Sequence, residues 1–285
     1  MIHAQTFSAL KKGPKILIFG AIHGDEVCGP NAIGSMIKEF QSGKPILLKG
    51  SVTFVPIANP RAHAHNVRFR EENLNRVFRP TKTPRSYEAR LANVLCGMVD
   101  TCDVLLDVHS TSGKGEPFIY LDFPTKRNRA WAQVLGPKTA IIGWPELYET
   151  LGSAHRSYDT TAYAARKRRS GLLIECGQHT DKQAAGVAHR AIRNTLKYYG
   201  LIAGAPASRP LSLVKMEHVF FHKSGERFAV PTWKHLDLVA KGSPLILRES
   251  APAICAPYDG YIVMPFSDAP LGDDWLYFGK GVDSK

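Results

Sequence analysis

The chain has 285 residues, of which 44% are hydrophobic and 22% charged, and this composition and length favour one large globular domain with a small appendage. No run approaches the roughly 18 apolar residues of a membrane span, and no secretion signal opens the chain, so we expect a cytoplasmic protein without membrane contact. The net charge is +12, and the basic side chains are densest at residues 126–129 and 166–169. These clusters lack the aromatic residues and motifs of nucleic-acid binding, which favours solvated faces or the attraction of acidic substrates.

Short apolar runs alternate with longer helical patterns over the first two hundred residues, as in an α/β layered structure. The expected strands are nearly continuous apolar runs, typical of strands covered on both faces, at residues 15–21, 51–58, 103–109 and 171–177. The expected helices span residues 26–40, 86–99, 126–134, 158–167 and 181–199. Thr180 or Asp181 can cap the last of them, and Gly200 follows it.

The pattern changes after Gly200. Residues 204–210 are rich in turn-forming residues, and the runs beyond them are short, β-like and interrupted by glycine and proline. We therefore predict a catalytic domain over residues 1–205 and a small, all-β C-terminal domain over residues 206–285.

Four metal-binding or acid–base side chains fall at the ends of three expected strands. His23 and Glu26 form a His-x-x-Glu pair just after the first, His109 ends the third, and Glu175 lies near the end of the fourth. Open α/β sheets build their sites at the carboxyl ends of strands. Each residue alone is equally compatible with a satisfied core histidine or a surface ion pair. Carboxylates on buried strands are costly without a metal or a cation, which favours a shared site.

Two histidines and one glutamate suit a catalytic zinc, which takes three protein ligands and keeps a fourth position for water. We therefore expect one Zn²⁺ per chain, held by His23, Glu26 and His109. Glu175, a fourth group, suits the general base that takes a proton from water. Asp107 lies two residues before His109, projects to the same side of the strand, and is expected to support a site histidine.

A second group of polar residues lies between the second and third strands. Arg68, Asn75 and Arg76 fall in this stretch, and arginine forks bind carboxylates in a bidentate manner. A metal cleft flanked by these three side chains would suit a substrate with a free carboxylate. The alternative is that they are surface charges of a long loop.

At these positions the chain resembles the aspartoacylase and succinylglutamate desuccinylase family, relatives of zinc carboxypeptidases. The matching motifs are Gly20-Ala21-Ile22-His23-Gly24-Asp25-Glu26, Asn59-Pro60-Arg61-Ala62, Arg68 with Asn73-Leu74-Asn75-Arg76, Asp107-Val108-His109-Ser110-Thr111 and Ile174-Glu175-Cys176-Gly177.

The resemblance implies a zinc-carboxypeptidase-like mixed sheet flanked by helices, a small C-terminal β domain, and zinc-dependent hydrolysis of a small anionic N-acyl amino acid. It also implies roles for single residues. Arg68 would polarise the scissile carbonyl, Asn75 and Arg76 would hold a substrate carboxylate, and Glu175 would act first as base and then as acid.

One position departs from the family. Its acylases place a substrate-binding arginine directly after a Tyr-x-Thr-Thr motif, where this chain has Ala162. Arginines follow only later, as Arg166, Arg168 and Arg169.

Two other functions compete with deacylation: a zinc carboxypeptidase acting on peptides, and a basic, zinc-containing binding module without activity. A purely structural zinc would not need Glu175, which favours an enzyme. The sequence leaves open the acyl group, the amino acid and a homo-oligomeric state.

Overall fold

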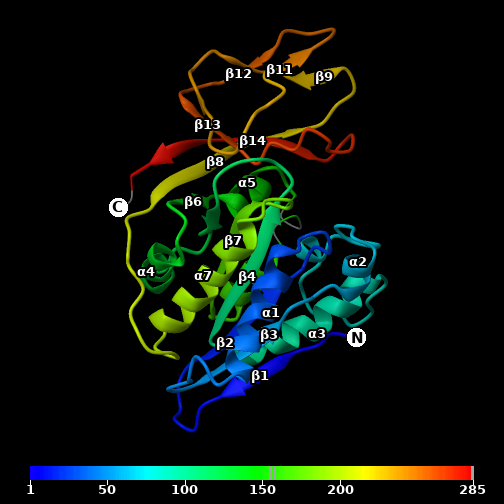
Figure 1. Cartoon of the computed structure of the whole chain (residues 1–285). Coiled ribbons are helices and arrows are strands. Elements are labelled where there is room, and N and C mark those ends of the chain that lie inside the picture. The colour runs from blue at the N-terminus through cyan, green and yellow to red at the C-terminus, as the bar shows by residue number, and fades with distance from the viewer. Residues whose placement is uncertain (154–155, 157, 284–285) are drawn as a thin grey trace.

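The computed structural model describes residues 1–153, 156 and 158–283 (Figure 1). An eleven-stranded mixed sheet runs through it in the order β1-β3-β2-β4-β7-β5-β6-β8-β14-β13-β10, and a three-stranded sheet has the order β12-β11-β9. The strands are β1 Gln5–Ser8, β2 Lys15–Gly20, β3 Ser51–Val55, β4 Val104–Thr111, β5 Phe118–Tyr120, β6 Thr139–Ile142, β7 Ser170–Gln178, β8 Ser212–Phe221, β9 Glu226–Phe228, β10 Leu238–Val239, β11 Pro244–Arg248, β12 Ile254–Cys255, β13 Gly260–Val263 and β14 Asp274–Val282. The helices are α1 Cys28–Gln41, α2 Pro60–Ala64, the 3-10 helix η1 Leu74–Arg76, α3 Tyr87–Thr101, α4 Lys126–Leu135, α5 Trp144–Thr150, α6 Thr160–Arg166 and α7 Ala184–Tyr198.

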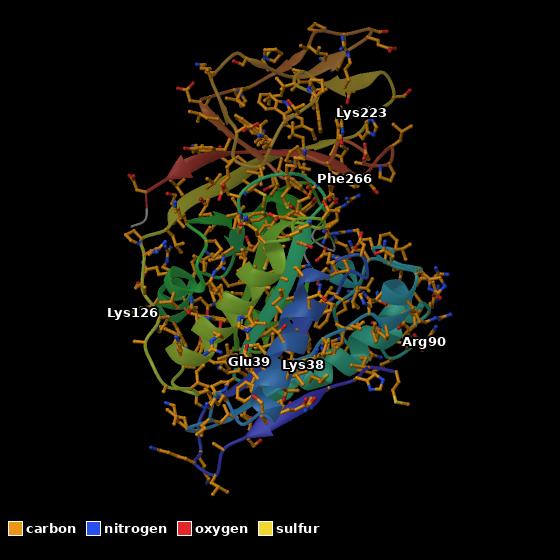
Figure 2. The ribbon with its side chains drawn as sticks, viewed as in Figure 1. Lys38, Glu39, Arg90, Lys126, Lys223 and Phe266 are labelled. Carbon is orange, nitrogen blue, oxygen red and sulfur yellow. The ribbon has the colours of Figure 1, made fainter. Side chains whose placement is uncertain are left out.

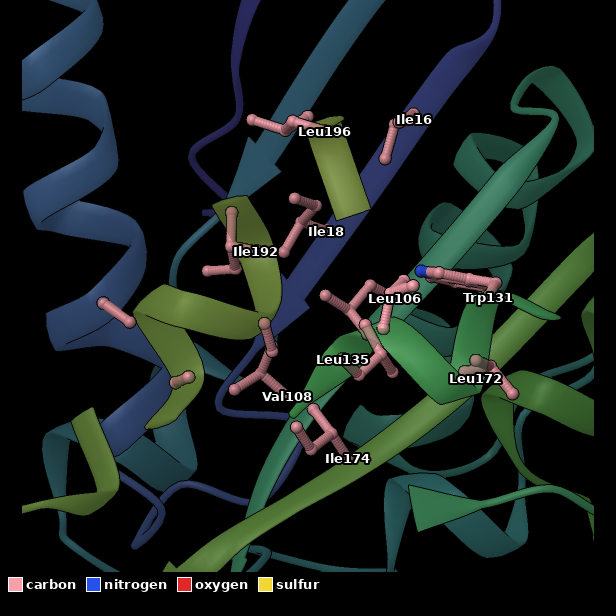
Figure 3. Packing of buried hydrophobic residues seen from close by; sticks show 14 of the residues in the cluster. Ile16, Ile18, Leu106, Val108, Trp131, Leu135, Leu172, Ile174, Ile192 and Leu196 are labelled. Carbon is pink, nitrogen blue, oxygen red and sulfur yellow. The ribbon is translucent and has the colours of Figure 1, made fainter. Parts of the chain in front are cut away.

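The centre of the sheet is parallel and covered on both faces. Strand β2 pairs in parallel with β3 and β4, and β4 pairs in parallel with β7. Ile16 and Ile18 face a core cluster shared with α1, α4 and α7, whereas Leu17 and Phe19 face a second cluster shared with α3 and α6. Figure 3 shows the first cluster closely packed. Successive side chains of a strand point to opposite faces, which explains why these runs are continuously apolar.

The predicted mixed sheet flanked by helices is confirmed, and each predicted strand and helix is present with shifted ends. The largest shifts are of three residues, at the end of β3, which is Val55, and at the start of α7, which is Ala184. Asp181 does not cap this helix, as we expected it or Thr180 to do; its Oδ1 accepts the Gln183 N–H at 2.8 Å, in a turn before the helix. Gly200 follows the helix with φ +68°, a conformation that favours glycine.

The helices carry their charged side chains on outward faces. Lys38 on α1, Arg90 on α3 and Lys126 on α4 are exposed and extend away from the sheet (Figure 2). Within the described part of the chain, no helix is long and apolar enough to cross a membrane. The cytoplasmic location stays a prediction.

The C-terminal segment continues the central sheet. Strand β8 pairs in parallel with β6, and β14, β13 and β10 extend the sheet by antiparallel pairing. A core cluster joins Phe118 and Trp144 of the first segment to Met216 and Tyr277 of the second. The boundary between residues 205 and 206 stays a prediction, and the shared sheet brings C-terminal side chains toward the site described next.

Candidate active site

The turn between β2 and α1 carries His23 and Glu26 and is fixed by close backbone contacts. Its Gly24 N–H donates to the Arg68 carbonyl at 3.1 Å, and the His63 ring donates through Nδ1 to the Gly24 carbonyl at 2.8 Å. A Cβ on Gly24 would lie 2.2 Å from the carbonyl carbon of Ala62, so only glycine fits there. The turn is therefore held against the segment that carries Arg68.

His23, Glu26 and His109 are buried and converge. Nδ1 of His23 lies 2.7 Å from Glu26 Oε1, and Nδ1 of His109 lies 2.9 Å from Glu26 Oε2. One ligand atom from each of the three residues lies within 4.8 Å of the others, a spacing that one metal ion can bridge. A second group, Asp25, Glu26 and His179, has similar spacing but shares Glu26 and is less buried.

The outer nitrogen of each site histidine faces an oxygen. His23 Nε2 lies 3.1 Å from Asn73 Oδ1. His109 Nε2 lies 2.9 Å from Asp107 Oδ2, although the angle is outside that of a hydrogen bond, and Thr160 Oγ1 donates to the same carboxylate oxygen at 2.6 Å. Acceptors on the Nε2 side favour the tautomer whose Nδ1 lone pair points inward, as a metal requires. Asp107 was expected in this position; Asn73 was not assigned this role from the sequence.

Burial and charge act in opposite directions on the three residues. Burial, helped by the Arg68 guanidinium, lowers the pKa of His23 to about 3. Burial alone would raise the pKa of Glu26, but His109 and His23 outweigh it and hold that pKa well below its usual value. Burial alone would lower the pKa of His109, but Asp107 and Glu26 outweigh it and raise that pKa well above its usual value. The cluster is thus a buried carboxylate between two imidazoles, a donor set that suits zinc.

Glu175 lies beside the cluster on the next strand. In the parallel register of β4 and β7 it is the direct partner of His109. Its Oε2 is buried and has no hydrogen-bond partner among the described residues. Burial, with a further contribution from Glu26, raises the pKa of Glu175 to about 8. A carboxyl group whose pKa lies near neutrality can both accept and return a proton.

The predicted substrate-binding residues approach the cluster from the segment around η1. Arg68 Nη1 donates to Glu26 Oε1 at 3.3 Å. Asn75 is buried, and its Oδ1 lacks a partner among the described side chains. Arg76 lies over the Trp144 ring, with its guanidinium carbon 4.9 Å from the ring centre.

A small pocket of about 70 Å³ brings these groups together. Its lining residues are His23, Arg68, Asn75, Arg76, His109, Tyr120, Asp122, Trp144, Asp159, Thr161, Leu173, Glu175 and Met264. Of the predicted metal-binding, catalytic and substrate-binding residues, Glu26 alone is not among the lining residues.

The far wall of the pocket was not foreseen. It includes Tyr120 at the end of β5 and Asp122 just after it. Met264 reaches the pocket from the C-terminal segment, with its Sδ 3.0 Å from the Tyr120 hydroxyl. The one local signal was Asp159, which precedes two threonines and caps α6 by accepting the Ala162 N–H at 2.7 Å.

None of the three later arginines is among the described residues that line this pocket. Arg166 lies over the ring of Tyr158, and Arg169 donates to the Asp100 carbonyl at 2.9 Å, at the amino end of β7. Glu175 lies toward the opposite end of that strand. Whether one of these arginines replaces the family arginine at Ala162 stays an open question.

Comparison with known proteins identifies relatives of this chain. The chain is 30% identical to an aspartoacylase of Danio rerio over 137 residues, 44% of this chain and 42% of that protein. It is 28% identical to an N-alpha-acetyl-L-2,4-diaminobutyric acid deacetylase of Halomonas elongata over 204 residues, 68% of this chain and 57% of that protein. The matched part thus spans about half the length of these curated relatives.

The fold has close structural counterparts. A crystal structure of a succinylglutamate desuccinylase/aspartoacylase from Rhodobacter sphaeroides superposes with a TM-score of 0.79 at 18% identity, over 99% of this chain and 89% of that one. The family model of the succinylglutamate desuccinylase/aspartoacylase catalytic domain matches residues 12–196, more than half of the sequence. The protein therefore belongs to the succinylglutamate desuccinylase/aspartoacylase family.

Proposed function

We propose that the protein is a zinc-dependent amidohydrolase that cleaves the amide bond of a small N-acyl amino acid. One observation carries the proposal. The unpartnered Oε2 of Glu175 lies in the same pocket as His23 and His109, whose Nδ1 atoms converge on Glu26. Three buried ligands and a separate carboxylate are the parts that a hydrolytic zinc site needs.

Each residue then has a distinct task. When bound to His23, Glu26 and His109, zinc supplies Lewis acidity that polarises the amide carbonyl and acidifies water. Glu175 takes the proton of the attacking water at Oε2 and returns it to the departing nitrogen. Arg68 donates hydrogen bonds to the carbonyl oxygen as negative charge develops on it.

The substrate carboxylate has its own partners. Asn75 and Arg76 would hold it, and the Arg76 guanidinium is already oriented by its stacking on Trp144 and by its hydrogen bond from Nη1 to the Asn75 carbonyl at 3.0 Å. An oriented guanidinium binds a carboxylate with less loss of side-chain freedom.

The pocket supports a small substrate over a peptide. Its volume of about 70 Å³ suits a short side chain or acyl group. The relatives from Danio rerio and Halomonas elongata are named for deacylation, which also supports this reaction. A purely structural zinc module would leave the buried, unpartnered Glu175 oxygen without a purpose. A homo-oligomer stays a prediction.

Two measurements test the proposal. Elemental analysis of the purified protein should find one zinc per chain, and His109→Ala should lose it. Full zinc occupancy in that variant would refute the ligand set. A screen of N-acetyl, N-succinyl and longer N-acyl amino acids with the zinc-loaded protein should then detect amine release. Release from peptides alone would favour a carboxypeptidase.

A further inference from the structure

Two carboxylates outside the catalytic cluster line the pocket. Asp159 is buried, and Asp122 keeps part of its surface accessible. Among the described residues, no lysine, arginine or histidine nitrogen lies within the 4.0 Å of an ion pair with either one. Two acidic groups thus line one small pocket without an ion-pair partner among the described residues.

Each carboxylate has a structural task that does not need its charge. Asp159 Oδ1 accepts the Ala162 N–H at 2.7 Å and the Thr161 hydroxyl at 2.8 Å. Asp122 Oδ1 accepts the N–H of Trp144 at 2.9 Å, at the start of α5. Asparagine caps helices as well as aspartate does, so capping alone leaves the two negative charges unexplained.

The charges are costly where they lie. Burial raises the pKa of Asp122 well above its usual value, and nearby Asp159 raises it further. Burial also raises the pKa of Asp159, and Arg76 only partly offsets this. A buried charge is normally paired, so the arrangement lacks a positive partner.

Two other polar atoms of the pocket also lack a partner, which indicates that the pocket is open to a polar ligand. Trp144 Nε1 and Asn75 Oδ1 are buried and have no hydrogen-bond partner among the described residues, and both side chains line the pocket. Asn75 is 3% exposed and Trp144 is 7% exposed, so water has little access to either. Unpartnered buried polar atoms are rare in native proteins and call for an explanation.

The pocket therefore has two kinds of charge. Arg68 and Arg76 supply positive charge beside Asn75, whereas Asp122 and Asp159 supply negative charge. We propose that the pocket selects an N-acyl amino acid whose side chain carries a positive charge, such as an ammonium group. Asp122 and Asp159 receive that cation, while Asn75 and Arg76 hold the α-carboxylate. This selectivity rests on the proposed deacylase function. It keeps the α-carboxylate but departs from the anionic substrate expected from the sequence, because the side-chain ammonium makes the substrate a zwitterion without net charge.

Matched substrates of similar length test the selectivity. Zinc-loaded protein is assayed with N-acetyl-L-ornithine, its neutral counterpart N-acetyl-L-norvaline and its acidic counterpart N-acetyl-L-glutamate. Hydrogen bonds to charged groups imply that kcat/KM for the cationic substrate is about 10- to 100-fold above that for the neutral one. Equal or higher values for the neutral or acidic substrate would overturn the inference and leave the deacylase function intact.

A binding arm separates the two proposals. Calorimetry with free L-ornithine, L-norvaline and L-glutamate measures charge preference without turnover. If no N-acyl amino acid is hydrolysed but ornithine binds at least about 10-fold more tightly than the other two, the deacylase function fails and the cation site stands. If ornithine has no advantage in binding or in turnover, the cation site fails.

Asp122→Asn and Asp159→Asn remove one charge each while keeping an oxygen that can cap the helix. Each should lower kcat/KM for N-acetyl-L-ornithine by about 10-fold or more and leave N-acetyl-L-norvaline nearly unchanged. Asp259→Asn is the matched control, because Asp259 is exposed, accepts the Lys241 N–H at 2.7 Å and does not line the pocket. Loss of activity on both substrates in equal proportion would assign Asp122 and Asp159 to helix capping alone.

Discussion

His235 should make the folded protein sensitive to mild acid. This residue lies between β9 and β10, is 5% exposed, and its ring centre is 4.0 Å from that of Phe118. Its Nδ1 accepts the Met264 N–H at 3.2 Å, and its Nε2 is buried with no partner among the described residues. Protonation would place an N–H against the Met264 N–H, and burial lowers the pKa of His235 to about 3.

The pKa of His235 is about 6.5 in the unfolded chain and about 3 in the folded protein, and this difference sets the direction and size of the effect on stability. Between pH 6.5 and about 3, unfolded chains bind a proton at His235 that the folded protein does not. The free energy of unfolding therefore falls as the pH is lowered through this range. At pH 5, which is 1.5 units below 6.5, the contribution is about 2 kcal/mol, at roughly 1.4 kcal/mol per unit.

Urea unfolding at pH 7 and pH 5, followed by tryptophan fluorescence, measures the effect in wild type and in His235→Asn. The asparagine oxygen can still accept the Met264 N–H but does not titrate. The variant loses packing against Phe118 at both pH values, so only the difference between the two pH values is compared. His23, whose pKa is also lowered, contributes equally to both proteins and cancels. An identical loss of stability on acidification in both proteins would refute this reasoning.

Three further predictions concern the reaction. Glu175→Gln should keep the zinc, measured by elemental analysis, and lower kcat about 10²- to 10⁴-fold, because an amide cannot accept the water's proton. Arg68→Ala should lower kcat about 10²- to 10³-fold. Arg76→Ala should mainly raise KM, because the contact of Arg76 with the substrate carboxylate is made equally in the ground and transition states. Steady-state kinetics that show the reverse would exchange the roles of the two arginines. The Glu88 carboxylate accepts hydrogen bonds from the backbone N–H groups of residues 70–72 at 2.8–3.3 Å. Glu88→Gln should therefore loosen the segment that carries Arg68 and reduce kcat without loss of zinc. An unchanged kcat would mean that Glu88 contributes to the stability of the fold but not to the reaction.

The sequence was most informative where one local pattern sets both the structure and the site. Strands β2, β4 and β7 are apolar on both faces, so their residues identify them as central parallel strands. Parallel strands end at the same edge of a sheet, so His109 and Glu175 could be placed together without knowing the strand order. The parallel pairing of these two residues agrees with that reasoning. Their catalytic roles stay predictions.

Helix ends were less predictable because several polar residues compete near them. Thr180 and Asp181 both suit a cap, yet α7 begins at Ala184 because Asp181 closes a turn with Gln183 instead. The parallel pairing of β8 with β6 could not be predicted from the sequence either. Residues 204–210 indicate a turn-rich boundary, but turn composition does not say whether the next strand joins the existing sheet or begins another.

Apart from Asp159 before its two threonines, no sequence pattern indicated the pocket wall that carries the proposed specificity. Asp122 follows a three-residue strand, and Trp144 begins a short helix. Met264 has φ +45° and directly follows β13 in the C-terminal part of the sheet. These residues meet only because β5 lies antiparallel beside β7 and the C-terminal strands continue the same sheet. The proposed metal ligands, by contrast, lie on and after the parallel strands β2 and β4. A substitution at Asp122 or Met264 can therefore alter which substrate fits without displacing His23, Glu26 or His109.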